Sequence, residues 1–388
     1  MTFLLYIALG YLLITTIILY RNRLDFTPLK TSRHSYFNDQ APKVSLCIPA
    51  RNEAPSIEQC VCSALDQQYP NYEVFVLDDG STDGTSEILN KLSETYPNKL
   101  TIIPGEPKPK DWLGKAWACH QLSEATTGDI LVFIDADTWL EKETISRLIR
   151  TMGHDIVDFV TLWPEQILGT FWERNAIPLI YFALLTLLPV RYVYQDPKWV
   201  PSFLRKKVTP IFAAACGQFM AFKRKAYETI GGHASVKDHV VEDVALAKNI
   251  KRAGLKMNMY HGKNTVSCRM YTSGSELWEG LRKNFLAGFG YNIPFFIGMG
   301  MLQFITFVLP AVTLPFLISG KINMLLMLDL TNIGLMLTQR AMIDRWFNWN
   351  RWYSWLHPLG VCWYEWLGIR VLMDYFKKET VQWKDRRI

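Results

Sequence analysis

Apolar residues are spread unevenly along this 388-residue chain. Residues 3–20 are apolar and uncharged over about the minimum length of a membrane-spanning helix, and residues 293–318 form a second such segment. Residues 40–290 instead alternate between short apolar runs and polar stretches, as soluble α/β domains do. The pattern therefore predicts a soluble domain between membrane segments.

Short apolar runs in the central region predict strands, and the polar stretches between them predict helices. The strands are expected at 44–49, 73–78, 100–103, 130–134 and 156–162, and the helices at 56–66, 84–94 and 114–124. Such alternation favours right-handed βαβ units and a mostly parallel sheet. In a sheet of this kind, ligands bind beyond the carboxyl ends of the strands.

The first apolar segment predicts an N-terminal transmembrane helix at residues 1–22. Arg21 and Arg23 follow it directly, and the positive-inside rule then places the next residues in the cytoplasm. We therefore expect a multi-pass protein of the cell (plasma) membrane with a cytoplasmic domain at 40–290. Residues 177–190, which Pro178 interrupts, are too short to span and predict a core or interfacial helix.

The C-terminal region, residues 291–376, holds two further apolar stretches after 293–318. One is 323–337, which contains Asp329, and the other is 359–373, which contains two charges. Two spans return the basic tail at 377–388 to the cytoplasm, whereas three would leave it outside. We expect two spans and an interfacial segment rich in tryptophan, with Trp346, Trp349, Trp352, Trp355, Trp363 and Trp366.

Charge and cysteine content limit the kinds of binding partner and the cell compartment that are expected for this chain. The net charge of +6 is too diffuse for a nucleic-acid-binding protein, and basic residues gather beside apolar segments, which fits an anionic membrane leaflet. The seven cysteines show neither metal-site spacing nor a disulfide framework, so a reducing cytosolic location is the simpler interpretation.

Asp135 and Asp137 follow the apolar run 130–134 and are the strongest indication of chemistry. Mg²⁺ typically binds one or two carboxylates together with substrate phosphates, so this pair suggests a metal that holds a nucleotide diphosphate. Acidic pairs at strand ends also cap helices, and the motif alone leaves both readings open.

Two further motifs close the neighbouring strands. Pro49, Ala50, Arg51 and Glu53 end the first, and Asp78 and Asp79 end the second within a sequence of turn-forming residues. A nucleoside needs donors and acceptors at its base and ribose, and these side chains supply them. Each motif alone could equally be a turn or a helix cap.

Lys115 follows Gly114 at the start of a predicted helix, where a phosphate can meet both the amine and backbone amides. Glu242 and Asp243 lie in the first turn of another helix, where the helix dipole favours acidic residues in any case. Asp243 is the best candidate for a general base, with His233, His239 and His261 as alternatives. Arg282 could clamp a pyrophosphate or anchor the chain at the membrane.

Together these motifs resemble those of membrane-bound family 2 glycosyltransferases with the GT-A fold, a Rossmann-like α/β fold. The resemblance implies that Asp79 contacts uracil, Asp135 the ribose, and Asp137 a Mg²⁺ or Mn²⁺ ion. It implies that Asp243, with Glu242 beside it, serves an inverting transfer from a UDP-sugar. Processive synthases carry a glutamine where this chain has Met342, three residues before Arg345, which disfavours polymer synthesis.

The loop around Trp112, together with the short hydrophobic C-terminus, is similar to the subgroup acting on isoprenoid lipids. That subgroup includes the 4,4'-diaponeurosporenoate and the hopene-associated glycosyltransferases. It implies glucose transfer to a carotenoid acid, with Trp112 and Trp278 expected at the acceptor and Arg282 at the donor. Hopanoid, diacylglycerol or polyprenyl phosphate acceptors, and a non-catalytic membrane scaffold, are the alternatives.

Overall fold

The computed structural model describes residues 1–30, 41–319, 323–377, 379, 382–383 and 386–387. The chain forms two compact units. We call residues 26–167 and 190–270 the sheet unit, and residues 1–25, 168–189 and 271–388 the helical unit.

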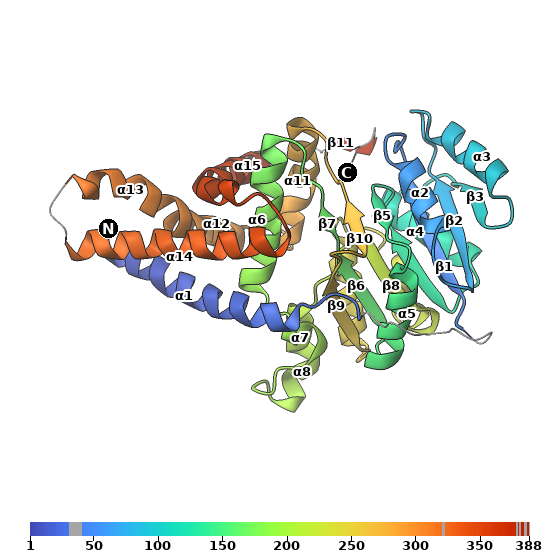
Figure 1. Cartoon of the computed structure of the whole chain (residues 1–388), viewed down its shortest axis with the longest axis horizontal. Coiled ribbons are helices and arrows are strands. Elements are labelled where there is room, and N and C mark those ends of the chain that lie inside the picture. Colours follow the sequence, from blue (N-terminus) through green and yellow to red (C-terminus); the bar gives the residue numbers. More distant parts are fainter. Residues whose placement is uncertain (31–40, 320–322, 378, 380–381, 384–385, 388) are drawn as a thin grey trace. The chain divides into compact units, whose positions relative to one another are not determined.

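A seven-stranded sheet in the order β3-β2-β1-β4-β8-β6-β9 forms the centre of the sheet unit (Figure 1). Its strands are β1 (Val44–Ala50), β2 (Tyr72–Asp78), β3 (Leu100–Pro104), β4 (Ile130–Ile134), β6 (Phe159–Trp163), β8 (Phe219–Lys223) and β9 (Met257–His261). Neighbouring strands pair in parallel except β8, which is antiparallel to both β4 and β6. The predicted, mostly parallel sheet is confirmed. A second sheet has the order β5 (Thr138–Leu140), β10 (Val266–Cys268), β7 (Glu165–Gln166).

The helices of this unit are α2 (Ile57–Leu65), α3 (Thr85–Thr95), α4 (Gly114–Ala125), α5 (Thr144–Asp155), α7 (Arg191–Tyr194), α8 (Ser202–Val208), α9 (Arg224–Thr229) and α10 (Glu242–Arg252), with 3₁₀ turns η1 (Thr209–Phe212) and η2 (Gly232–Val236). Every residue of β4 is buried. Val132 and Ile134 join a core cluster that includes residues of α2 and α5, while Phe133 stacks on Tyr227 of α9. Because both faces are covered, the strand reads as an unbroken apolar run.

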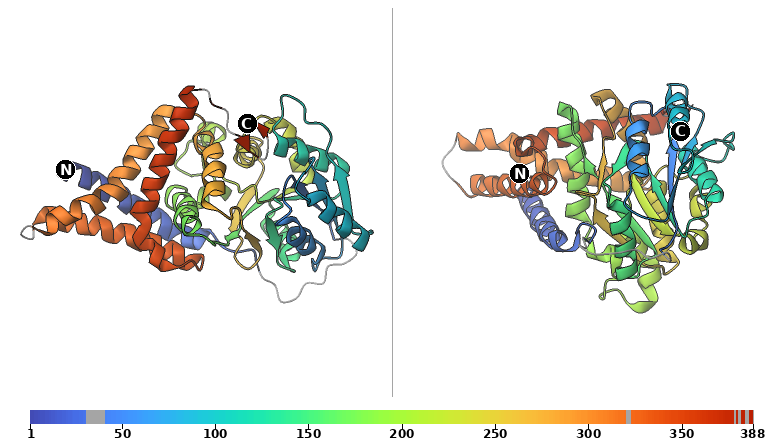
Figure 2. Two further views of the ribbon diagram at one scale, coloured as in Figure 1. Left: turned by 90° about the horizontal axis from the view of Figure 1, so that it is seen from above. Right: turned by 45° about the vertical axis from the view of Figure 1, so that its right-hand side comes forward.

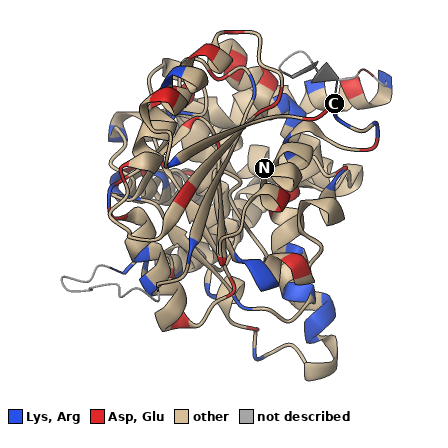
Figure 3. Cartoon of the chain, turned by 90° about the vertical axis from the view of Figure 1, so that its right-hand side faces the viewer, with Lys and Arg blue, Asp and Glu red and all other residues tan. Residues whose placement is uncertain are grey.

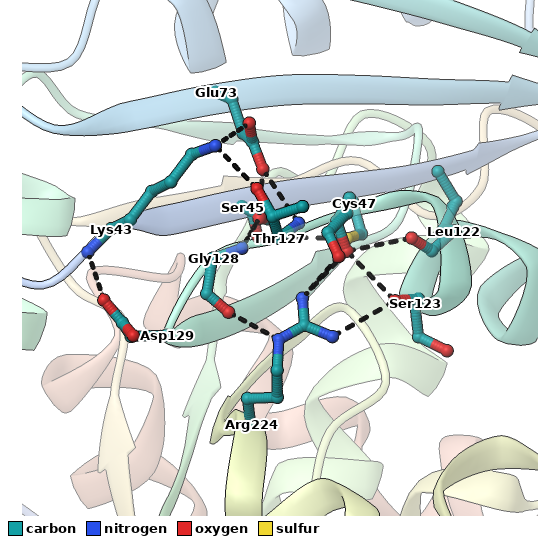
Figure 4. Close-up of polar contacts among 11 residues, drawn as sticks. Lys43, Ser45, Cys47, Glu73, Leu122, Ser123, Thr127, Gly128, Asp129 and Arg224 are labelled. Atoms are coloured by element: carbon teal, nitrogen blue, oxygen red, sulfur yellow. Dashed lines mark hydrogen bonds and ion pairs between the residues drawn. The ribbon is translucent and has the colours of Figure 1, made fainter.

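A polar network holds the edge of the sheet where β1 and β4 begin (Figure 4). Glu73 pairs with Lys43 and accepts a hydrogen bond from Ser45 Oγ at 2.7 Å. Ser45 Oγ in turn accepts the N–H of Gly128 at 2.9 Å, and Arg224 donates to the Gly128 carbonyl at 2.7 Å. These bonds fix the connection between α4 and β4, and so the register that carries β4 to the opposite edge.

The helical unit contains α1 (Thr2–Asp25), α6 (Phe171–Leu187), α11 (Gly274–Gly288), α12 (Ile293–Gln303), the π-helix η3 (Phe304–Val308), α13 (Leu309–Ile318), α14 (Met324–Trp346), the 3₁₀ turn η4 (Arg351–Leu356) and α15 (His357–Lys377) (Figure 2). The short strands β11 (Gln382–Trp383) and β12 (Arg386–Arg387) pair at its end. Buried amides join α14 to α1, since Asn332 donates to the Leu5 carbonyl at 3.0 Å and Gln339 to the Leu12 carbonyl at 2.9 Å.

Two helices in the described residues, α1 and the continuous helix from Ile293 to Ile318, are long and apolar enough to cross a membrane by length and composition. Buried core helices and signal sequences meet the same criterion, so the number of spans stays a prediction. Asp329 of α14 is fully buried, and its Oδ1 accepts a hydrogen bond from Thr313 at 2.9 Å, which satisfies one oxygen of this carboxyl group. Most of the predicted basic tail at 377–388 lies outside the described residues.

The helix predicted at 177–190 is α6, which belongs to the helical unit. It begins earlier than its apolar run because Thr170 and Glu173 form a capping box. The residues of the predicted domain at 40–290 are therefore divided between the two compact units.

Candidate active site

The carboxyl ends of β1 and β2 are joined directly. Pro49 and Ala50 end β1, and the Ala50 carbonyl accepts the N–H of Asp79 at 2.8 Å. Arg51 then reaches across and donates to the carbonyls of Asp79 and Gly80. Gly80 has a φ of 68°, which glycine adopts without strain. Hydrogen bonds thus join the two loops into one rim.

Asp78 and Asp79, which follow one another at the end of β2, have different surroundings. Asp78 accepts the N–H of Ser81 at 3.0 Å and a bond from the Ser86 hydroxyl, so its carboxylate builds the turn. Asp79 is buried and follows the end of β2. Glu53 accepts a bond from Ser56 Oγ at 3.3 Å beside the start of α2. The turn reading therefore holds for Asp78.

Lys115 lies between two carboxylates from different elements. It is the second residue of α4, and its Nζ is 2.7 Å from Asp135 Oδ1 and 3.1 Å from Glu242 Oε1. The side chains of Lys115 and Asp135 remain 35% and 24% exposed, so a ligand can reach them. The structure thus brings together three residues that the sequence singles out separately.

Asp243 is fixed by two backbone amides at the start of α10. Its Oδ2 accepts the N–H of Gly217 at 2.8 Å and its Oδ1 that of Val244 at 2.7 Å. A Cβ at Gly217 would lie 2.9 Å from Lys115 Nζ and 3.4 Å from Asp243 Oδ2. Gly217 is therefore the point where the Lys115 cluster and Asp243 meet.

Crowding of these carboxylates shifts their titration. Burial and the adjacent Glu242 together raise the pKa of Asp243 to about 7, against the opposing effect of Lys115. Burial likewise raises the pKa of Asp135 to about 6, with Lys115 opposing and Asp137 adding to the rise. Burial acts to raise the pKa of Glu242, but the Lys115 cation and the hydrogen bonds to the carboxylate together outweigh it, so the pKa of Glu242 is lowered. Shifted carboxylates in an accessible site are typical of functional centres.

Asp137 lies between β4 and β5, at the end of a chain of buried hydrogen bonds. Gln166 donates to Gln218 Oε1 at 2.8 Å, and Gln218 Nε2 donates to Cys268 Sγ at 2.9 Å. The Cys268 thiol contacts Asp137 Oδ1 at 3.5 Å, and Thr138 Oγ1 donates to the same oxygen at 3.2 Å. Burial and Asp137 raise the pKa of Cys268, which keeps it a neutral thiol.

Sequence patterns did not indicate Gly217, Gln218 or Cys268. Gln218 precedes β8, and its carbonyl accepts the Asp135 N–H at 3.4 Å because β8 is antiparallel to β4. The start of an antiparallel strand reaches the same edge as the ends of parallel ones. In the sequence, the one feature that could have indicated these residues is Gly217 in front of the apolar run that forms β8.

Asp135 and Asp137 fit a hard divalent cation that is also held by substrate phosphates. No group of three or more His, Cys, Asp or Glu side chains in the described residues could hold a metal by itself. Mg²⁺ and Mn²⁺ prefer oxygen ligands, and Mg²⁺ is commonly held by one or two carboxylates and the phosphates of a substrate. Asp137, with Asp135 two residues away, supplies that number of carboxylates.

The residues predicted at the acceptor lie in different units. Trp112 packs in the sheet unit against Trp117 and His120, with ring centroids 5.0 Å away in each case. Trp278, on α11 of the helical unit, lies 5.3 Å from Trp363. Both acceptor roles stay predictions.

Arg282, predicted at the donor, is also on α11. Its Nε is 2.6 Å from Asp374 Oδ2, and its guanidinium also pairs with Glu279 at 3.1 Å. The pair with Asp374 joins α11 to α15, whereas the pair with Glu279 lies within α11. The donor role of Arg282 stays a prediction.

Two of the candidate histidines are built into the interior of the sheet unit. His233 is buried, hydrogen-bonded to Tyr227 Oη at 2.7 Å, and burial lowers its pKa to about 3. His261 packs on Phe26, and burial lowers its pKa to about 4. Both imidazoles are therefore neutral near pH 7, which suits packing rather than proton transfer.

Family models match both halves of the chain. Residues 45–231, which include the strand-end motifs and Lys115, match glycosyl transferase family 2. Residues 198–388 match glycosyl transferase family 21.

Residues 45–231 of this chain thus carry a glycosyl transferase family 2 domain.

Curated proteins similar to this chain include 4,4'-diaponeurosporenoate glycosyltransferases of two staphylococci. The chain is 31% identical over 265 residues to a 4,4'-diaponeurosporenoate glycosyltransferase of Staphylococcus aureus, with 66% of this chain and 64% of the relative covered. It is 26% identical over 254 residues to the protein of that name from Staphylococcus haemolyticus, with 65% and 63% covered. The matched region thus spans less than two thirds of these relatives.

A solved structure shares the fold. A mannosyltransferase from Pyrobaculum calidifontis, determined with GDP-mannose and Mn²⁺, superposes with a TM-score of 0.55 at 18% identity, covering 97% of this chain and 99% of that one. At this identity the likeness concerns the fold alone. The predicted GT-A fold is confirmed.

Proposed function

We propose that this protein transfers a sugar, most simply glucose from UDP-glucose, to a membrane-embedded isoprenoid lipid, and that the acceptor is a carotenoid acid. The observation that carries the proposal is the convergence of Asp135 and Glu242 on Lys115, with Asp243 beside them, at the carboxyl edge of the sheet. The names of the staphylococcal relatives support the acceptor.

The donor is held at the strand ends. The rim of Arg51 and Asp79 is suited to the uracil, and Asp135 to the ribose. Asp137, with Asp135 nearby, would hold Mg²⁺ or Mn²⁺, which neutralises the diphosphate leaving group when bound. Donor phosphate oxygens would also attract Lys115. The mannosyltransferase of the same fold was solved with a nucleotide sugar and Mn²⁺, which supports divalent-metal use.

Transfer is proposed as a single displacement with inversion. An acceptor oxygen attacks the anomeric carbon while the bond from that carbon to the diphosphate breaks, and the electron pair leaves with UDP. When the acceptor is an alcohol, its proton passes to Asp243, which two backbone amides hold in place. A carotenoid acid is already ionised near neutral pH, and Asp243 then orients the acceptor.

Two apolar helices of spanning length support a membrane location. Because an isoprenoid substrate stays in the bilayer, an enzyme at the membrane surface can meet it there. Together with the arginines after residue 20, this supports a plasma-membrane protein with a cytoplasmic catalytic domain.

The test is incubation of membranes that contain the protein with radiolabelled UDP-glucose, Mn²⁺ and candidate lipids, followed by analysis of the organic phase. We expect labelled product with a carotenoid acid and none with the Asp137→Ala variant. Product formed equally well in lipid extracts without carotenoids would favour a hopanoid, diacylglycerol or polyprenyl phosphate acceptor. If calorimetry showed that the protein does not bind UDP, the alternative of a non-catalytic membrane scaffold would be favoured.

A further inference from the structure

The segment from residue 198 to residue 211 exposes apolar side chains and basic side chains side by side. It includes α8, in which no residue is buried. Phe203 is 81% exposed, Ile211 72% and Trp199 66%. Exposed apolar side chains of this size mark interaction surfaces when they are grouped. We call residues 198–211 the α8 surface.

This grouping distinguishes the α8 surface from the rest of the sheet unit. Among the described residues of that unit, the other exposed large apolar side chains are Tyr96, Ile156 and Ile167, which lie far apart in the sequence. In the α8 surface, Leu204 adds a further one between Phe203 and the basic residues.

The charge of this surface has one sign. Arg205, Lys206 and Lys207 form the last turn of α8, and Lys198 precedes Trp199. In Figure 3 the lowest helix, which is α8, carries this Lys and Arg colouring. Amphipathic segments with Trp and Phe beside Lys and Arg bind at the headgroup level of anionic bilayers.

The α8 surface is fixed on the rest of the sheet unit through aromatic rings and α10. Phe212 lies 5.1 Å from Tyr192 and 6.5 Å from Trp199, measured between ring centroids. Lys251 of α10 donates to the Tyr192 carbonyl at 2.6 Å. The apolar side chains are thus presented outward by a packed base that touches the helix carrying Asp243.

We propose that the α8 surface docks on an anionic lipid surface. This gives the sheet unit a membrane contact of its own, separate from the spanning helices, and it holds α10 close to the bilayer where a lipid acceptor resides. The inference rests on the proposed membrane location.

Collisional quenching in reconstituted full-length protein tests this inference. The protein is placed in bilayers of brominated phosphatidylglycerol or brominated phosphatidylcholine, and the signal of Trp199 is obtained as the difference between the wild type and Trp199→Phe. Trp117→Phe supplies a matched control, because Trp117 is a half-buried tryptophan of α4 in the same unit. We expect strong quenching of Trp199 in the anionic lipid and none of Trp117.

A triple variant, Arg205→Ser with Lys206→Ser and Lys207→Ser, shows whether the basic side chains attract the anionic headgroups or whether Trp199 is simply near the bilayer. We expect it to reduce Trp199 quenching in phosphatidylglycerol severalfold, to the level in phosphatidylcholine, and to lower turnover of a lipid acceptor while UDP binding stays unchanged. Equal quenching in both lipids, unaffected by the triple variant, would overturn the role of anionic headgroups.

Two other outcomes would also overturn the proposal. Trp199 that resists brominated lipid but is quenched by aqueous iodide would be a solvent-facing residue. Trp199 that resists both would be covered by protein, such as a second copy of the chain. In each case the remaining tryptophans of the helical unit report whether the protein entered the bilayer, so loss of membrane location is recognised separately.

Discussion

Lys115 Nζ lies 2.7 Å from Asp135 Oδ1, although the two residues come from different elements of the sheet unit. Glu242 completes the contact from α10 at 3.1 Å. One cation therefore joins the end of β4 to the start of α10, and it does so at the edge of the sheet where GT-A ligands are expected. Because Lys115 pairs with both carboxylates, it also couples them electrostatically.

Replacement of Lys115 by methionine tests this role. A hydrogen bond to a charged group is worth about 1.5–3 kcal/mol, so we expect Lys115→Met to lower kcat/KM for the donor by about 10- to 100-fold. Lys142→Met is the matched control, because Lys142 pairs with Asp66 and both are well exposed. Initial rates with UDP-glucose measure both variants, and an effect of similar size in the control would contradict the prediction.

The close approach at Gly217 gives a second prediction. An alanine Cβ would displace Lys115 Nζ, the flexible end of a side chain, so the fold should tolerate it. We expect Gly217→Ala to leave Tm within a few degrees of the wild type while donor kcat/KM falls about 10-fold or more. Gly153→Ala is the control, since a Cβ there meets nothing within 4 Å and alanine favours helix α5. A large loss of Tm in Gly217→Ala would show that the glycine is needed for folding instead.

The residues that sequence reasoning found share a local signal. Asp79, Asp135 and Lys115 each stand where an apolar run ends or a helix begins, and turn-forming residues mark these points. Gln218 and Cys268 carry no such signal, because their place beside Asp137 depends on the antiparallel pairing of β8 and on β10 joining β5. Pairing between distant segments cannot be read from periodicity, and the helix α6 could not be assigned to the helical unit for the same reason.

The hydrogen-bond chain behind Asp137 predicts that Cys268 and Gln218 act as positioning residues. Groups that orient a metal-binding carboxylate typically change metal affinity about 10- to 100-fold when they are removed. We expect Cys268→Ala to weaken Mn²⁺ binding in the presence of UDP by about 10-fold, and Cys268→Ser, which keeps a donor, to restore most of it. Titration of Mn²⁺ by electron paramagnetic resonance measures this directly. Cys62→Ala, at a half-exposed position of α2, should bind Mn²⁺ like the wild type. Unchanged affinity in Cys268→Ala would refute the role.

The network around Glu73 predicts a pH-dependent stability. Burial acts to raise the pKa of Glu73, but bonds from Lys43, Ser45 and Thr127 outweigh it, so the pKa is lowered. A carboxyl with a lowered pKa stabilises the fold above its unfolded pKa, and this stabilisation is lost as the pH falls through the folded pKa. We expect Glu73→Gln to lower Tm at pH 7, and this difference to shrink progressively as the pH falls below the unfolded pKa of about 4.3 toward the lower folded pKa. A constant difference across this range would mean that shape rather than charge is responsible.

Asp243 allows the chemical class of the acceptor to be identified from a pH profile. Its pKa of about 7 means that the carboxylate form needed for a general base increases as the pH rises from 6 to 8. With an alcohol acceptor we therefore expect the wild-type rate to rise across this interval, and Asp243→Asn to lower kcat about 10²- to 10⁴-fold. With a carotenoid acid, whose carboxyl is ionised throughout, the profile should be flat and the loss in Asp243→Asn less than about 10-fold. Glu242→Gln serves as the comparison, because removal of the neighbouring charge should shift the alcohol profile toward lower pH. An alcohol profile that stays flat in the wild type would show that another group accepts the proton.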